Sequence, residues 1–211
     1  MKQIIIINAS PRKNWNTAQL LKEAQKGAES AGAKTEYVNL YDLNFTGCRS
    51  CLACKRKGVQ RNKCYWKDDL SPLIDKILNS DGVIIGSPIY LGQPTAHFRA
   101  LYERLAFCVL SYDNRQSYLD RQINVGIIYT MNAPFAYYQS SIHPFLEPAE
   151  GVLKHLLKGK VLSYGACDTL QVKDYSLYSM GMFDAAHKNH EHETQFPKDL
   201  EKASELGKNI V

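Results

Sequence analysis

The stretch IIIINASPRKNWNTAQLL, Ile4 to Leu21, decides how the chain begins to fold. Its four isoleucines form an apolar run without polar alternation, which is typical of a parallel strand buried on both faces of a sheet. A polar loop follows, and apolar residues then recur at helical spacing from Asn16 until Gly32 ends the pattern. The stretch therefore predicts a strand over Lys2–Asn8, a loop and a helix.

Strand-like and helix-like segments continue to alternate along the rest of the chain. Further strands are expected over Lys34–Leu40, Asp81–Ser87, Ile123–Thr130 and Val161–Leu170. Helices are expected over Asp69–Asn79, from Pro94 onward, over Glu150–Leu157 after an irregular loop containing Pro144 and Pro148, and over Phe196–Val211. Alternation of this kind implies right-handed crossovers and a parallel sheet covered on both faces. The predicted fold is α/β, a flavodoxin-like three-layer sandwich with a five-stranded parallel sheet of order 2-1-3-4-5.

Length and composition indicate one globular domain. The 211 residues fit a single flavodoxin-like domain over residues 1–211, with a cysteine-bearing insertion at about residues 46–67. The net charge of +5 favours anionic ligands but is too small to call for nucleic acid. No apolar stretch reaches the ~18 to 20 residues that span a bilayer, and the N-terminus lacks a signal peptide. We therefore expect a cytoplasmic protein without membrane contacts.

Three loops are expected to meet at the carboxyl edge of the sheet, where open α/β sheets bind ligands. They are Asn8–Asn16, Ser87–Gln93 and Thr130–Tyr138. The first places the hydroxyls of Ser10 and Thr17 at a helix N-terminus, which suits a phosphate, although Asn and Thr are also ordinary helix caps. Neither a Walker A lysine pattern nor a GxGxxG follows any strand, so ATP and a Rossmann-bound dinucleotide lose support.

The second and third loops have the composition of a ring-binding site. Gly86 to Gly92 reads GSPIYLG, whose glycines and proline hold the backbone close to a heteroaromatic edge, although it is also a common strand-ending turn. Aromatic residues surround the third loop and either wall a substrate pocket or pack beneath the loop or at a subunit contact. They are Tyr129, Phe135, Tyr137 and Tyr138.

Two motifs together carry a family resemblance: S-P-R-x-x-x-N-T after the first strand and G-S-P-I-Y-x-G after the third. The chain resembles the NAD(P)H-dependent FMN reductase family, and more closely its iron–sulfur flavoprotein branch. The resemblance implies FMN as cofactor and NAD(P)H as co-substrate. It also implies ten cofactor-binding residues: Ser10, Arg12, Asn16, Thr17, Pro88, Ile89, Tyr90, Gly92, Thr130 and Asn132.

The chain departs from the family pattern at two positions. Ala9 and Trp15 stand where the family usually has glycine. Trp15 is the larger change, because it disfavours a left-handed backbone that glycine would adopt freely. We expect its indole either to cover the phosphate end of the cofactor or to reshape the loop.

The leading functional hypothesis is an FMN-dependent oxidoreductase that passes electrons from NADH or NADPH to a flavin, quinone or similar small acceptor. The cofactor carries out the hydride and electron chemistry, so no catalytic side chain is assigned. One alternative is an electron carrier with FMN and a [4Fe–4S] cluster that serves a protein redox partner such as ferredoxin. Another is a nonenzymatic module in which Trp15 has abolished FMN binding. The resemblance also implies a homodimer or homotetramer.

A cysteine cluster is the second strong signal. Cys48, Cys51 and Cys54 are spaced by two residues, and Cys64 follows after nine more. Such a set can supply the four thiolates of a [4Fe–4S] cluster, although the iron–sulfur branch usually has a shorter last gap. Zinc is a second alternative, and redox thiols are a third, because many basic neighbours would lower the thiol pKa values. Those neighbours are Lys55, Arg56, Lys57, Arg61, Lys63 and Lys67.

The remaining cysteines and the histidines receive no role. Cys108 and Cys167 fall on expected core positions and are interpreted as small core residues. His187, His190 and His192 lie in a charged segment, and their spacing alone does not predict a metal site.

Overall fold

The computed structural model describes residues 1–211, and its centre is a parallel sheet. The sheet contains β1 (Gln3–Asn8), β2 (Lys34–Asn39), β3 (Gly82–Tyr90), β5 (Ile123–Thr130) and β6 (Lys158–Ala166). These strands lie in the order β2-β1-β3-β5-β6, which confirms the predicted flavodoxin-like order. One strand was not predicted: the short β4 (Gln93–Pro94) pairs antiparallel with β3.

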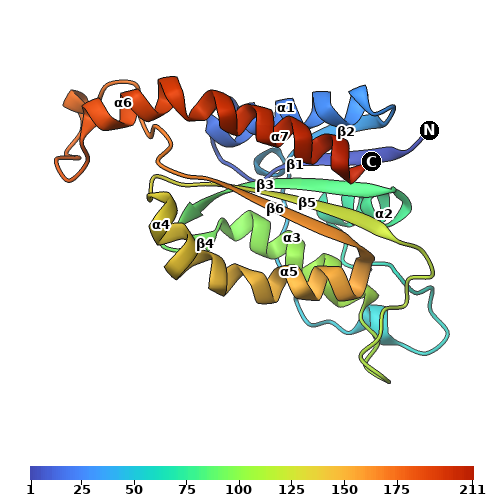
Figure 1. The fold of residues 1–211 in the computed structure, drawn as a ribbon. Coiled ribbons are helices and arrows are strands. Elements are labelled where there is room, and N and C mark those ends of the chain that lie inside the picture. Colours follow the sequence, from blue (N-terminus) through green and yellow to red (C-terminus); the bar gives the residue numbers. More distant parts are fainter.

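Helices cover both faces of the sheet, as Figure 1 shows. One face carries α1 (Asn16–Ser30) and α7 (Phe196–Ile210), and the other carries α2 (Leu70–Asn79), α3 (Ala96–Val109) and α5 (His143–Leu157). Successive isoleucines of β1 point to opposite faces, so Ile4 and Ile6 join the core under α1 and α7 while Ile5 and Ile7 join the other core. Burial on both faces explains why the strand has no polar alternation.

Two proline predictions were wrong. Pro94 lies in β4, and α3 begins only at Ala96, because Thr95 caps it with a hydrogen bond from the Phe98 amide (3.2 Å). The expected irregular loop before Glu150 is mostly helical. It consists of α4 (Phe135–Tyr137), a π-helical turn (Tyr138–Ile142) and α5, which takes Pro144 in its first turn and Pro148 in its interior.

The end of the chain also differs from expectation. The last strand, β6, ends at Ala166 rather than at Leu170, so residues 167–171 form a loop. The helix α6 (Ala185–Thr194), which contains the three clustered histidines, was not predicted. Its N-terminus is capped by Asp184, whose Oδ1 accepts hydrogen bonds from the amides of Ala186 and His187.

Glycines allow α1 and α7 to pack with their backbones almost in contact. A Cβ added to Gly27 would lie 2.0 Å from the carbonyl oxygen of Ser204, and one added to Gly207 would lie 1.9 Å from that of Ala24. The two helices therefore approach each other more closely than any larger residue at these positions permits.

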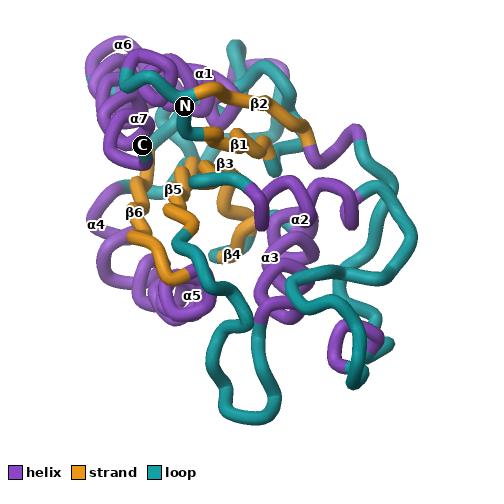
Figure 2. The backbone as a smooth tube through the Cα atoms, turned by 90° about the vertical axis from the view of Figure 1, so that its right-hand side faces the viewer, coloured by secondary structure: helices purple, strands orange, loops and turns teal.

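The cysteine-bearing insertion lies away from the carboxyl ends of the strands. In Figure 1 the strands run towards the left, whereas the insertion is the cyan segment at the lower right. Figure 2 shows the same segment as a loop beside α2 and α3. No helix in the structure combines the length and the apolar character needed to cross a membrane.

Candidate functional site

A crevice lies at the carboxyl ends of the strands, where the strand order reverses between β1 and β3. Its cavity has a volume of ≈ 480 Å³. All ten residues expected to contact a flavin line it: Ser10, Arg12, Asn16, Thr17, Pro88, Ile89, Tyr90, Gly92, Thr130 and Asn132. The structure thus brings the three expected loops together.

The first loop leaves the N-terminus of α1 open. No side chain caps this helix, so the amides of its first turn and its positive dipole end remain available to an anion. Asn16 and Thr17 do not act as caps, because the Asn16 amide donates to the Leu170 carbonyl (2.8 Å) and the Thr17 hydroxyl contacts that of Thr130. The arrangement has the features of a phosphate-binding loop.

The second loop is a tight hairpin between β3 and β4. Leu91 and Gly92 form its turn with φ angles of 52° and 80°. A two-residue turn with two positive φ values favours Gly or Asn, so Leu91 is strained. Its side chain is fully exposed and lies at the mouth of the crevice.

The four aromatic residues around the third loop lie in different environments. Tyr137 lines the crevice, while Tyr129 and Tyr138 are buried in the core and Phe135 is largely exposed. Burial raises the pKa of Tyr129, whose hydroxyl donates to Glu150 (3.2 Å). Of the four, only Tyr137 is placed as a wall of the crevice.

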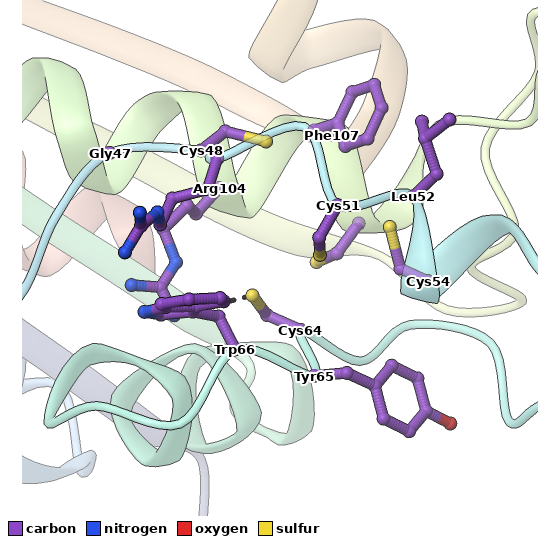
Figure 3. A pocket seen from close by; sticks show the side chains of 12 residues that line it. Gly47, Cys48, Cys51, Leu52, Cys54, Cys64, Tyr65, Trp66, Arg104 and Phe107 are labelled. Atoms are coloured by element: carbon purple, nitrogen blue, oxygen red, sulfur yellow. Dashed lines mark hydrogen bonds between the residues drawn. The ribbon is translucent and has the colours of Figure 1, made fainter.

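A second, smaller cavity lies at the cysteine-bearing insertion. It is lined by Cys48, Cys51, Cys54 and Cys64, together with Cys108 from α3. In Figure 3 the sulfurs of Cys51, Cys54 and Cys64 face a common space. The structure contains no group of three or more His, Cys, Asp or Glu side chains arranged as a metal-ion site, so ligation by the four cysteines of the insertion stays a prediction.

The basic residues of the insertion do not activate Cys54. Burial raises the pKa of this thiol, and nearby Lys55 opposes the shift without reversing it. The Lys55 ammonium instead donates to the carbonyls of Phe107 and Leu110, and Arg61 lies over the ring of Tyr118 (4.7 Å from guanidinium carbon to ring centroid). The prediction that neighbouring cations lower the thiol pKa is wrong for Cys54.

The two cysteines interpreted as core residues are both shielded from solvent. Cys108 is 1% exposed, and Cys167 is half-buried. Burial raises the pKa of both thiols, that of Cys167 to about 12. The position of Cys108 beside the cysteine cavity was not expected, because its distance in sequence gives no sign of it.

Comparison with known proteins identifies the fold and the family. The pattern that defines the family called NADPH-dependent FMN reductase matches residues 2–130. This chain belongs to that family. An iron–sulfur flavoprotein of Methanocaldococcus jannaschii is 35% identical over 102 residues, which cover 48% of this chain and 51% of that protein. One from Clostridioides difficile is 35% identical over 126 residues, covering 53% and 54%. The chain spans about half the length of these relatives.

Solved structures share the fold of this FMN reductase family member. An NAD(P)H:quinone oxidoreductase from Methanothermobacter marburgensis has a TM-score of 0.72 at 16% identity, covering 99% of this chain and 96% of that one. An azoreductase from Bacillus anthracis has a TM-score of 0.65 at 12% identity, covering 99% and 100%. The expected family and the flavodoxin-like fold are confirmed, and the chain is similar to proteins named iron–sulfur flavoproteins over about half of their length.

Trp15 fits the family's first loop without a left-handed backbone. Its φ and ψ angles of −105° and −166° are ordinary extended values, so glycine is not required at this position. The indole Nε1 donates to the Leu170 carbonyl (3.0 Å), and the Arg12 guanidinium lies 5.6 Å from the indole centroid. Trp15 therefore ties the loop to the segment after β6.

Sequence reasoning missed this segment after β6. Thr169, Leu170 and Gln171 form a fourth wall of the crevice, and Phe183 also lines it. The rule that all parallel strands end at one edge could have identified them, but the last strand was expected to continue through Leu170.

A buried lysine connects α6 to two of the crevice loops. Lys188 is 4% exposed, and its ammonium donates to the carbonyl of Asn132 (2.7 Å) and to the carboxylate of Asp168 (2.5 Å). Burial of a lysine requires such pairing. These contacts fix α6 beside the third loop and the segment after β6. No sequence pattern predicted them.

Proposed function

We propose that the chain is an FMN-dependent oxidoreductase that uses NADH or NADPH to reduce a small planar acceptor such as a flavin or quinone. The crevice carries the proposal, because it joins an open helix N-terminus to a half-apolar cavity large enough for a flavin ring. Family membership and relatives named as flavoproteins support the choice of ligand.

The chemistry of the crevice fits FMN at both ends. The first-turn amides of α1 and the Ser10 hydroxyl would hold the phosphate, while Arg12 lies close enough to add its charge. The side-chain oxygens of Asn132 and Gln171 are buried and have no hydrogen-bond partner. Unpartnered buried acceptors are costly, and the imide N–H of a flavin ring is a donor that would satisfy one of them.

The protein's part in the reaction is to bind and to orient. FMN, when bound, supplies a ring that accepts a hydride from a nicotinamide and returns electrons to an acceptor. Ile89, Met131 and Phe183 supply apolar surface in the crevice, which would shield from water the part of a bound ring that they cover. Backbone groups of the Pro88–Gly92 hairpin would orient the ring edge.

The mouth of the crevice suggests how the acceptor is received. Leu91 presents an exposed apolar side chain on a strained turn, and Tyr137 lies among the lining residues with it. An apolar rim of this kind suits a flat aromatic acceptor. Contact between the Leu91 side chain and the acceptor would give this strained, exposed leucine a function.

The test is an FMN titration followed by steady-state oxidation of NADH and of NADPH with a benzoquinone acceptor. We expect one FMN per chain and FMN-dependent nicotinamide oxidation.

Leu91→Asn keeps the turn, since Asn tolerates positive φ. It should raise KM for the quinone about threefold to tenfold, as expected for loss of ~1 kcal/mol of apolar contact, and leave FMN affinity unchanged. The matched control is Val152→Gln, an exposed apolar residue of α5 outside the crevice. Absence of FMN binding would favour the nonenzymatic module.

A second candidate function is electron transfer between FMN and an iron–sulfur cluster for a protein partner. The cysteine cavity and the relatives named iron–sulfur flavoproteins favour it. Helix α3 separates the two cavities within one chain: Arg104, which lines the cysteine cavity, lies about 14 Å along the helix from Thr95 at its N-terminus, at ~1.5 Å per residue. Iron and sulfide content with poor nicotinamide turnover would support this function.

The proposed homodimer or homotetramer has support in the exposed aromatic residues of α4 and α5. Phe135, Tyr137 and Phe145 are 55%, 54% and 71% exposed, and Tyr137 also lines the crevice. Aromatic surface of this extent is typical of a subunit contact. Light scattering coupled to size-exclusion chromatography measures the oligomeric state directly.

A further inference from the structure

Arg104 is the most deeply buried charged residue near the cysteine cavity. Its side chain is 1% exposed, which is rare for arginine unless its charge is paired, and its Nε is buried without a hydrogen-bond partner. Its Nη1 donates to the Asp68 carboxylate (2.5 Å) and the Thr46 carbonyl (3.1 Å). Its Nη2 donates to the Ser71 hydroxyl (2.6 Å) and to the Cys64 sulfur (3.4 Å).

The contact with Cys64 has a fixed direction. Guanidinium has donors and no acceptor, so the sulfur must be the acceptor. Burial is the largest single influence on Asp68 and opposes its ionisation, but the hydrogen bond and charge of Arg104, together with the amides of Thr46 and Leu70, outweigh it and lower the pKa of this carboxyl. Asp68 therefore balances the positive charge, and the Nη2 side of the guanidinium is directed at Ser71 and the cysteine cavity.

Cys64 and Cys108 differ in what their sulfurs do. The Cys108 sulfur donates back to the Leu105 carbonyl within its own helix (3.4 Å). The Cys64 sulfur accepts from Arg104 and faces the cavity with the sulfurs of Cys51 and Cys54 (Figure 3). Of the two cavity-lining cysteines outside the compact triple, Cys64 is thus the one whose sulfur is held toward Cys51 and Cys54 by a hydrogen-bond donor.

The long gap before Cys64 explains why such an anchor is needed. Residues 55–63 form an irregular loop with positive φ angles at Gly58 (76°) and Asn62 (58°). A loop of this length leaves the position of its last cysteine poorly determined by the first three. The rigid helix α3 supplies a fixed point through Arg104.

We propose that Arg104 is a positioning residue that holds Cys64 as the fourth thiolate ligand of a [4Fe–4S] cluster in the cysteine cavity. This rests on the second candidate function. The donor set fits the group: four thiols from one loop, cavity walls formed mainly by apolar side chains, and a hydrogen-bond donor to a ligand sulfur. On ligation each cysteine releases its thiol proton to solvent as its sulfur–iron bond forms, and no electron is transferred in that step.

The test is anaerobic reconstitution of the full chain with iron and sulfide, followed by metal and sulfide analysis and a potentiometric titration of the cluster. Wild type should hold about four irons per chain. Arg104→Met should reduce cluster content at least threefold or leave a three-iron form. Arg104→Lys, which keeps a charge but not the planar fork, should load and show a more negative cluster potential because a hydrogen bond to sulfur is weakened.

Controls separate positioning from folding. Arg99→Lys lies on the same helix, exposed and paired with Glu103, and should load as wild type. Asp68→Asn removes the counter-charge but leaves Arg104 facing Cys64, so it should retain the cluster even if it loses thermal stability. Cys108→Ala should also load fully. Circular dichroism and FMN content establish that each variant is folded.

Three results would overturn the proposal. The first is a full cluster content with an unchanged cluster potential in both Arg104 variants. The second is a full cluster content in Cys64→Ala. The third is a wild-type chain that binds no iron, or that binds zinc instead. In the last case, retained FMN binding and nicotinamide oxidation would leave the flavin-dependent oxidoreductase function intact.

Discussion

The hydroxyl oxygens of Thr17 and Thr130 lie 2.7 Å apart and join the first turn of α1 to the last residue of β5. Both residues are nearly fully buried, at 2% and 4% exposure, and both line the crevice. The pair therefore holds the expected phosphate end and the third loop in one fixed relationship, before any ligand binds.

Replacing one threonine of this pair should lower the free energy of unfolding more than replacing both. Thr17→Val keeps the side-chain shape but leaves the Thr130 hydroxyl buried without its partner, which should lower the free energy of unfolding by about 1–2 kcal/mol. The Thr17→Val, Thr130→Val double variant should recover part of that loss, because no unpaired hydroxyl remains. Urea unfolding of the four proteins in the cycle measures the coupling, and strictly additive losses would show that the hydroxyls do not interact.

The contact between α1 and α7 should not tolerate a methyl group. In Gly27→Ala the new Cβ would lie 2.0 Å from a backbone oxygen, which cannot rotate away, so the helices must separate. We expect a loss of about 3 kcal/mol or more in unfolding free energy. Gly151→Ala is the matched control, since its Cβ meets nothing within 4 Å in the helix α5 and should gain about 0.5–1 kcal/mol. Equal effects at the two positions would contradict this packing.

Asp199 should make stability depend on pH. It is 2% exposed, and burial raises its pKa although hydrogen bonds from Gln195 and Tyr164 oppose the shift. Between the unfolded pKa of about 4 and the raised folded value, the native state keeps a proton that the unfolded chain releases. Stability contributed by this group is thus present at low pH and lost as pH rises through that window.

Asp199→Asn should remove that dependence. The Asp199 Oδ2 atom is buried without a partner, so a neutral amide avoids the burial of a charge there. The variant should be more stable than wild type at pH 7, and the difference should shrink as the pH approaches 4. Thermal unfolding across this range measures it, and parallel curves for the two proteins would exclude a titrating Asp199.

The strand order could be predicted because each strand has a local signal. Four consecutive isoleucines are typical of a strand with two buried faces, and the two loop motifs contain eight of the ten residues that the structure brings to one crevice, with Thr130 and Asn132 from the third loop. Boundaries that depend on tertiary contacts could not be predicted. Pro94 belongs to β4 because the chain reverses after β3 and Pro94 pairs with Ile89. The sequence patterns that predict helices carry no information about this pairing.

The parts of the site that sequence could not predict depend on single long-range contacts. Lys188 reaches Asn132 across 56 residues, and Arg104 reaches Cys64 across 40. Lys188 lies in a charged segment, and Arg104 is a charged residue on a helix whose apolar side chains form part of the core. Only the folded chain shows that both are buried and that each supports a loop of a candidate site.

Trp15 should contribute to FMN binding through its indole N–H rather than through its backbone. Trp15→Phe keeps the aromatic face beneath Arg12 and removes the hydrogen bond to the Leu170 carbonyl, so the loop after β6 loses one tie to the phosphate loop. A lost hydrogen bond of ~1 kcal/mol corresponds to about a fivefold weaker FMN Kd. Trp15→Gly, the usual family residue, should weaken binding further, because it also loses the ring and adds backbone freedom to a position that does not need it. Fluorescence titration with FMN ranks the three proteins. Tighter binding by Trp15→Gly than by wild type would mean that the indole obstructs the cofactor.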